Sequence, residues 1–163
     1  LDNLVDLLKI ARENNLYVIL SWGFIPATYD SMMPEIDSNI EGFNNYLLNQ
    51  GVINALGQYI TDVLNNVNYR DSSVMNTILS VELLAEPFFQ TEKKPFSLSS
   101  GIVSVFGSNY DMSNAISRQQ LADDATSYWL SQVIGKVKLK YPDLLISVAL
   151  FSPLLWLIIL LFK

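Results

Sequence analysis

The stretch that decides the fold is Thr77-Ile-Leu-Ser-Val-Glu-Leu-Leu-Ala-Glu-Pro87, an apolar run that ends in a carboxylate and a proline. A short apolar run closed by a turn signal is typical of a buried strand. Proline lacks a backbone N–H, so it stops the strand. The sequence therefore predicts a strand near 76–85, with Glu86 at its carboxyl end.

Two other apolar runs flank this strand, and amphipathic segments separate them. Tyr17–Ser21 is apolar on both faces, which is typical of a buried parallel strand, and a third strand is predicted near 144–151. Helical periodicity predicts the segments between the strands as helices. The predicted helices are 2–14, 46–66 and 118–141, the last capped by Ser117. Long helices between apolar strands predict a parallel sheet with right-handed crossovers.

The loops indicate which kind of parallel sheet this is. Long loops, 22–39 and 88–117, follow the strands, whereas the connections from helix to strand are short. That asymmetry is typical of a barrel whose working face lies at the carboxyl ends of its strands. An open doubly wound sheet would have a Gly-rich first turn, and Gly101–Gly107 does not lie between a strand and a helix. The expected fold class is α/β, a partial (β/α)8 barrel, because a whole barrel needs about 250 residues.

Composition excludes several kinds of chemistry. The 163 residues carry a net charge of −6 and no basic patch, which argues against nucleic acid as a partner. Cysteine and histidine are absent, which excludes Ser-His-Asp and Cys-His nucleophile systems and Cys/His zinc sites. The acidic residues Asp111, Asp123 and Asp124 lack metal-site spacing, so no metal and no cofactor is expected. Chemistry in this chain must rest on carboxylates, hydroxyls, tyrosines or lysines.

Four blocks of sequence, taken in order, resemble glycoside hydrolase family 5, the cellulase family of clan A barrels. Val81–Pro87 resembles the fourth-strand signature of that family, where an apolar strand ends in Asn-Glu-Pro. The other matching blocks are 1–21, 45–64 and 128–153, which resemble the third strand with its helix, the next helix, and the fourth helix with the fifth strand. The resemblance implies a partial catalytic barrel over 1–153, followed by an atypical apolar tail over 154–163.

The resemblance implies a function as well. In the family, Glu86 would be the general acid/base of a retaining hydrolase that cleaves O-glycosidic bonds of a β-linked oligo- or polysaccharide. Such enzymes use two carboxyl groups about 5–5.5 Å apart. The family's nucleophile lies on the seventh strand, whereas this chain is expected to end just after the fifth, so the fragment alone is predicted to be inactive. An extracellular or secreted location follows by resemblance, although no signal peptide is present.

Four further positions around Glu86 carry predictions. Ala85 stands where the family has an Asn that helps to hold the substrate's 2-hydroxyl group, so a weak enzyme or an altered site is expected. Trp22 and Phe88 are candidate substrate-binding aromatics, and the alternative for both is loop packing. Glu82 shares strand parity with Glu86, but four strand residues span roughly 13 Å, too far for a catalytic pair. The alternative for Glu82 is a buried carboxylate paired with a basic residue.

Two alternative functions stay open. Ala85 is compatible with a non-catalytic, carbohydrate-binding pseudo-enzyme barrel. The stretch 144–162 is uncharged and long enough to be a candidate membrane span, which would make the chain a tail-anchored α/β protein. Against a span, the stretch begins as the expected fifth strand, and Ser152-Pro153 interrupts it. A truncated or frameshifted tail is favoured over an anchor.

Overall fold

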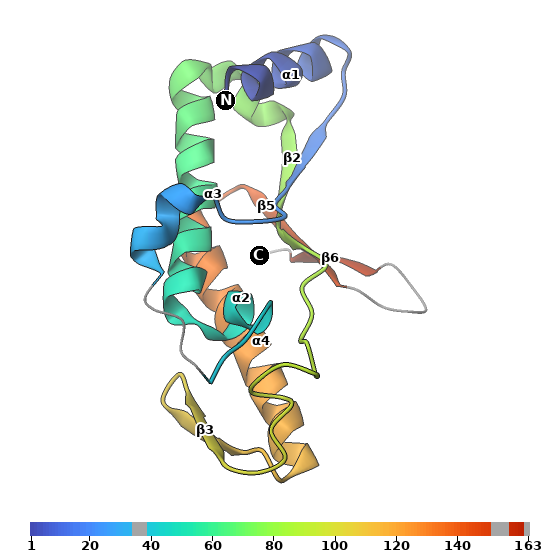
Figure 1. Cartoon of the computed structure of the whole chain (residues 1–163). Helices are drawn as coiled ribbons and strands as arrows, with labels where there is room; N and C mark the ends of the chain where they lie inside the picture. Colours follow the sequence, from blue (N-terminus) through green and yellow to red (C-terminus); the bar gives the residue numbers. More distant parts are fainter. Residues whose placement is uncertain (34–38, 151–156, 162–163) are drawn as a thin grey trace. The chain divides into compact units, whose positions relative to one another are not determined.

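The computed structural model describes residues 1–33, 39–150 and 157–161 (Figure 1). Its helices are α1 (Asp2–Glu13), η1 (Ala27–Met32), α2 (Asn44–Leu48), α3 (Gln50–Arg70), η2 (Ser72–Thr77) and α4 (Ala115–Lys138), where η denotes a 3-10 helix. Its strands are β1 (Val18–Ser21), β2 (Ile78–Ala85), β3 (Ile102–Val105), β4 (Ser108–Asp111), β5 (Leu145–Leu150) and β6 (Leu157–Leu161).

Strands β1, β2 and β5 form a parallel sheet with β2 in the middle. The strands predicted near 17–21, 76–85 and 144–151 are therefore confirmed, with their ends shifted by one or two residues. Helix α3 lies between β1 and β2 in the chain, and α4 lies between β2 and β5, as the crossover argument requires. The chain is thus a mixed α/β protein. The described residues form no closed barrel, so the partial (β/α)8 barrel stays a prediction.

The two faces of this sheet differ in chemistry. Leu20, Val81 and Ile146 occupy matching register positions, and all three are buried. On the opposite face, the matching positions hold Ser21, Glu82 and Ser147. A polar row therefore crosses the three parallel strands at one level, next to the carboxyl end of β1.

The apolar tail contributes a fourth strand to the sheet. Strand β6 pairs with β5 in the antiparallel direction, with Val148 opposite Ile159. The predicted interruption at Ser152-Pro153 lies outside the described residues. No helix in the described part of the chain is long and apolar enough to span a bilayer.

Asparagine residues mark the end of α1 and the boundary between α2 and α3. Helix α1 buries Val5, Leu8 and Ala11 along one stripe, and the chain then turns through Asn15 in the left-handed region, with φ 55°. The helix predicted over 46–66 is two helices, because Asn49 is extended between them and its side chain accepts the N–H of Gly51 at 2.9 Å. That side chain is an N-cap, so α3 begins at Gln50.

The start of α4 differs from the prediction in the same way. The Asn114 side chain accepts the N–H groups of Ile116 at 2.8 Å and Ser117 at 3.3 Å, so Asn114 caps the helix. The predicted cap, Ser117, is wrong by three residues. Its hydroxyl instead accepts the N–H of Asp111 at 2.8 Å and ties the end of β4 to the first turn of α4.

The segment 88–117, predicted as a long loop, contains the hairpin of β3 and β4. Val103 and Val105 are buried on one strand and Tyr110 on the other, so the hairpin has one packed face. Phe106 and Gly107 form its turn with φ values of 52° and 82°. Two consecutive residues with positive φ are the signature of a type I′ hairpin turn.

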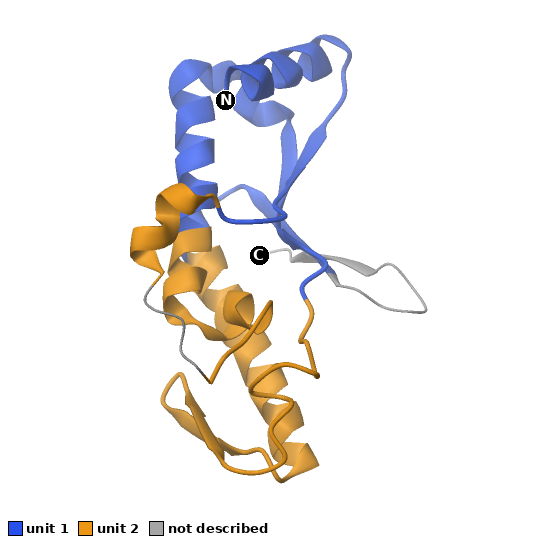
Figure 2. Cartoon of the chain, viewed as in Figure 1, with its two compact units in different colours: residues 1–25, 57–87, 136–163 blue, residues 26–56, 88–135 orange. Residues whose placement is uncertain are grey.

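The chain divides into two compact units, shown in Figure 2. Unit 1 comprises 1–25, 57–87 and 136–163, and unit 2 comprises 26–56 and 88–135. Unit 1 contains the mixed sheet and unit 2 the hairpin. Each unit buries its own apolar side chains, such as Leu64 and Leu83 in unit 1 and Leu121 and Trp129 in unit 2.

Candidate functional site

The candidate site is built at the carboxyl ends of β1 and β2, both in unit 1. Just past β1, the carbonyl of Trp22 accepts the N–H of Ala85 at 2.9 Å, which continues the pairing of the two strands beyond the last residue of β1. Glu86 is the next residue along the chain. The prediction that Glu86 follows directly after a parallel strand is therefore confirmed.

The backbone of Glu86 is in a conformation that side chains avoid. Its φ is 51°, in the left-handed region, and the next residue is the buried Pro87. A residue before proline ordinarily adopts extended backbone. Non-glycine residues held in such regions are destabilised by about 1–3 kcal/mol and occur most often at functional sites. The turn at Glu86 also means that its side chain does not simply follow the alternation of β2.

The Trp22 side chain is buried in unit 1, so its ring has no open face for a ligand. Its side chain is 8 % exposed and meets Tyr59 edge-on, with the ring centroids 5.1 Å apart and the planes at 72°. The indole N–H has no hydrogen-bond partner among the described residues. The alternative weighed for this residue was loop packing, and the structure instead places Trp22 among the buried side chains of the core.

Ala85 is exposed at the end of β2. A methyl group cannot donate a hydrogen bond, so this position supplies nothing to a hydroxyl group of a bound sugar. The family resemblance expects an amide here, and the structure offers no amide from Ala85 itself.

Glu82 lies within β2, before Ala85, and its carboxylate accepts a hydrogen bond from a hydroxyl group. The Ser21 hydroxyl donates to its carboxylate at 2.5 Å. No lysine or arginine of the described residues forms an ion pair with Glu82, so the predicted basic partner is not found in that part of the chain. The register of β2 against β5 shifts between Glu82 and Ala85, which breaks the parity that predicted Glu82 and Glu86 on one face.

Phe88 belongs to unit 2, where it forms one end of an aromatic stack. Its ring lies 5.0 Å from Phe43 with the planes at 9°, and Phe43 lies 4.9 Å from Tyr46 at 17°. Phe88 remains 48 % exposed. The exposed part of the Phe88 ring is compatible with the predicted substrate-binding role, and its stacking on Phe43 is also ordinary loop packing.

Asn44 holds this loop and could not be found from the sequence. It is fully buried, and its amide donates to the carbonyls of Gln90 at 3.1 Å and Lys94 at 2.9 Å. Its carbonyl accepts the N–H of Gln90 at 2.9 Å. Nothing near Asn44 in the sequence marks it, because its partners lie about 46 residues further along the chain.

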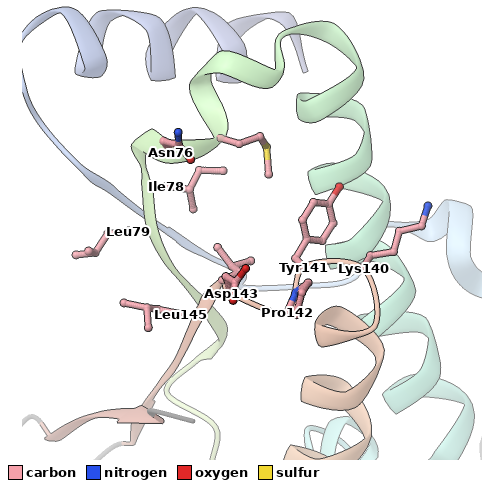
Figure 3. A pocket seen from close by; sticks show the side chains of 10 residues that line it. Asn76, Ile78, Leu79, Lys140, Tyr141, Pro142, Asp143 and Leu145 are labelled. Atoms are coloured by element: carbon pink, nitrogen blue, oxygen red, sulfur yellow. The ribbon is translucent and has the colours of Figure 1, made fainter.

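A separate cavity of about 370 Å³ opens at the opposite ends of the strands (Figure 3). Ile78, the first residue of β2, and Leu145, the first of β5, line it together with Lys140 and Tyr141. Burial raises the pKa of the Tyr141 hydroxyl, which donates to Asn65 at 2.9 Å. Because Ile78 and Leu145 are the first residues of their strands and Glu86 follows the last residue of β2, this cavity lies at the other end of β2 from Glu86.

The described residues contain no cluster of three or more acidic side chains that could hold a metal ion. Searches against protein-family models, curated proteins and solved structures find no match to this chain. The resemblance to glycoside hydrolase family 5 therefore rests on the sequence blocks quoted above.

Proposed function

We propose that this chain is part of a cellulase-type glycoside hydrolase that acts on a β-linked glycan, with Glu86 as its general acid/base. The observation that carries the proposal is the position of Glu86, directly after a parallel strand and beside the end of its neighbour. In barrel enzymes the catalytic residues come from this end of the strands. The strained backbone at Glu86 supports the same conclusion, because strain of this kind is concentrated at active sites.

The proposed chemistry needs two carboxyl groups, of which Glu86 is one. The Glu86 carboxyl group would protonate the departing glycosidic oxygen and later deprotonate the attacking water. A second carboxylate would attack the anomeric carbon from the other face. The resemblance places that nucleophile on a seventh strand, which is not among the described strands. The extracellular setting belongs to the same proposal.

Chemical rescue tests the role of Glu86 when the nucleophile is missing. With phenyl β-cellobioside and the matching mannoside, azide would attack the anomeric carbon while Glu86 gives its proton to the leaving oxygen. Unsubstituted phenol is a poor leaving group that needs this proton, so we expect azide-dependent release of phenol with this chain, and a loss of about 10²-fold or more in Glu86→Gln. Glu82→Gln is the matched control on the same strand and should keep the rescued rate. Equal rates in all three proteins would contradict the proposal.

A non-catalytic carbohydrate-binding role is the second candidate, and Ala85 is the observation that favours it. Hydrogen bonds to the 2-hydroxyl that strengthen in the transition state supply several kcal/mol, and Ala85 cannot make one. This candidate predicts that β-linked oligosaccharides bind in a calorimetric titration while azide rescues no turnover. Turnover lost in Glu86→Gln would decide for the enzyme.

A further inference from the structure

Unit 2 contains a cavity of about 490 Å³ that has no part in the site at Glu86. It lies between the loop that follows β2 and the first turns of α4, and its lining residues are Phe89, Thr91, Phe96, Ala115, Arg118, Gln119 and Ala122. Small-molecule sites are usually clefts of about 300–1,000 Å³ with mostly apolar walls and a few polar groups. This cavity has both features.

Its apolar wall is a pair of phenylalanine rings held from behind. Phe89 and Phe96 lie 4.9 Å apart with their planes at 55°. Both are partly buried and pack against the core cluster of unit 2, which includes Met112 and Leu121. Rings anchored in this way are ordered before a ligand arrives, so less conformational entropy is lost on binding.

The polar side of the cavity is positive. Arg118 is half-buried in the first turn of α4, and it forms no ion pair or side-chain hydrogen bond with any described residue. The amino end of a helix carries partial positive charge, which adds to that of the guanidinium group. The side chain of Asn114 already occupies the N–H groups of Ile116 and Ser117, so Arg118 is the group free to bind an anion.

Gln119 also lines the polar side of the cavity, and as a neutral residue it leaves the positive charge of Arg118 uncompensated. Its amide nitrogen donates to Asp123 at 2.8 Å, which holds that carboxylate one turn further along the helix. The amide oxygen of Gln119 and the hydroxyl of Thr91 remain as neutral polar groups at the wall. The cavity therefore combines an aromatic wall with a single cation.

We propose that this cavity binds a ring-bearing carboxylate, with the ring against Phe89 and Phe96 and the carboxylate paired with Arg118. A guanidinium group can bind a carboxylate through two parallel hydrogen bonds, which suits the single arginine at this wall. Two kinds of molecule share this chemistry, an aromatic acid and a uronic acid residue of a glycan. The inference is independent of the role of Glu86.

The test is a titration of the whole chain followed by NMR, with two pairs of probes. Phenylacetate is compared with its neutral isostere phenylacetamide, and glucuronate with glucose. We expect the carboxylate of at least one pair to bind about tenfold or more tightly than its neutral partner, because hydrogen bonds to charged groups are the stronger ones. The pair that shows this preference identifies the source of the ligand.

Variants locate the binding. Arg118→Gln should abolish the preference for the carboxylate, whereas Arg70→Gln, which removes an exposed arginine of unit 1, should leave it unchanged. Phe96→Leu should weaken both members of the preferred pair. Far-UV circular dichroism checks that each variant is folded. No binding of any probe at about 10 mM, equal binding within both pairs, or a preference that survives Arg118→Gln would overturn the proposal.

Discussion

The backbone of Glu86 separates this residue from an ordinary carboxylate at the end of a strand. Left-handed backbone is easy for glycine and unfavourable for a residue with a Cβ atom. The chain nevertheless places a glutamate there, at φ 51°, immediately before a buried proline. Folding stability alone would favour glycine at this position.

Replacing Glu86 with glycine should relieve the strain. The relief is partly offset, because glycine gives the unfolded chain more conformational freedom, worth about 0.4–1 kcal/mol. We expect the free energy of unfolding of Glu86→Gly to equal that of the wild type or to exceed it by up to about 1 kcal/mol. Urea denaturation measures the difference.

Glu82→Gly is the matched control. Glu82 lies in the interior of the strand that precedes Glu86, and its φ is not positive. Its free energy of unfolding should fall by about 0.5–1 kcal/mol because glycine destabilises the interior of a strand. It should fall further because the hydrogen bond from Ser21 is lost. If both variants lost the same amount, the left-handed backbone at Glu86 would carry no strain.

The sequence predicted the position of Glu86 but not its surroundings. A run of apolar residues closed by proline is a local signal, so the end of β2 could be located within one residue. Asn44, which organises the loop near Phe88, has partners far along the chain and no local signature. The burial of Trp22 against Tyr59 is likewise a tertiary contact between distant segments.

At the scale of elements, two turns in different units use the same Asp-x-Ser arrangement. The Asp71 carboxylate accepts the N–H of Ser73 at 3.0 Å and its hydroxyl at 2.5 Å, at the start of η2. Asp111 does the same with Ser113, at 2.8 and 2.7 Å, between β4 and α4. In each case the hydrogen bond from the serine hydroxyl is the largest cause that lowers the pKa of the carboxyl group.

These turns should make folding stability depend on pH in the acid range. A carboxyl group whose pKa is lower in the folded state stabilises the fold above its unfolded pKa, near 4. That contribution is lost as the pH falls through the lower folded value. Ser113→Ala should therefore raise the pKa of Asp111 toward its ordinary value, as followed by NMR titration of the carboxyl carbon.

The same substitution should reduce the acid sensitivity of folding, measured as unfolding free energy between pH 2 and 6. Ser108→Ala, at the other end of β4, is the control and should leave the titration of Asp111 unchanged. If the pKa of Asp111 did not move in Ser113→Ala, the hydroxyl group would not be what stabilises its carboxylate.

Elements that are marked by a pattern of neighbouring residues could be predicted from the sequence, and the others could not. The three parallel strands were predicted because continuous apolar runs mark them. The hairpin over 102–111 was missed, because Phe106-Gly107 is not one of the residue pairs that mark a two-residue hairpin turn. Strand β6 was missed for a different reason. A continuous apolar run does not specify a strand partner or its direction.

At the scale of the whole molecule, α3 and α4 each have residues in both units. Residues 50–56 of α3 belong to unit 2 and residues 57–70 to unit 1, while α4 contributes 115–135 to unit 2 and its last turn to unit 1. Breaking α3 between Leu56 and Gly57 would leave backbone groups without partners at two new helix ends. Helix formation is also cooperative, with an unfavourable nucleation step. Separate unfolding of one unit would therefore disrupt helices that the other unit also uses.

We accordingly expect the two units to unfold in a single transition, with tryptophan as the reporter in each. Trp22 reports on unit 1 and Trp129 on unit 2 when the other tryptophans, including Trp156, are replaced by phenylalanine. In both backgrounds, Leu83→Ala in unit 1 and Leu121→Ala in unit 2 should each lower the unfolding free energy by about 2–5 kcal/mol, because each empties a fully buried site. Coupling requires that each reporter respond to both substitutions in urea denaturation followed by fluorescence. If Trp22 responded only to Leu83→Ala and Trp129 only to Leu121→Ala, the shared helices would not couple the two cores.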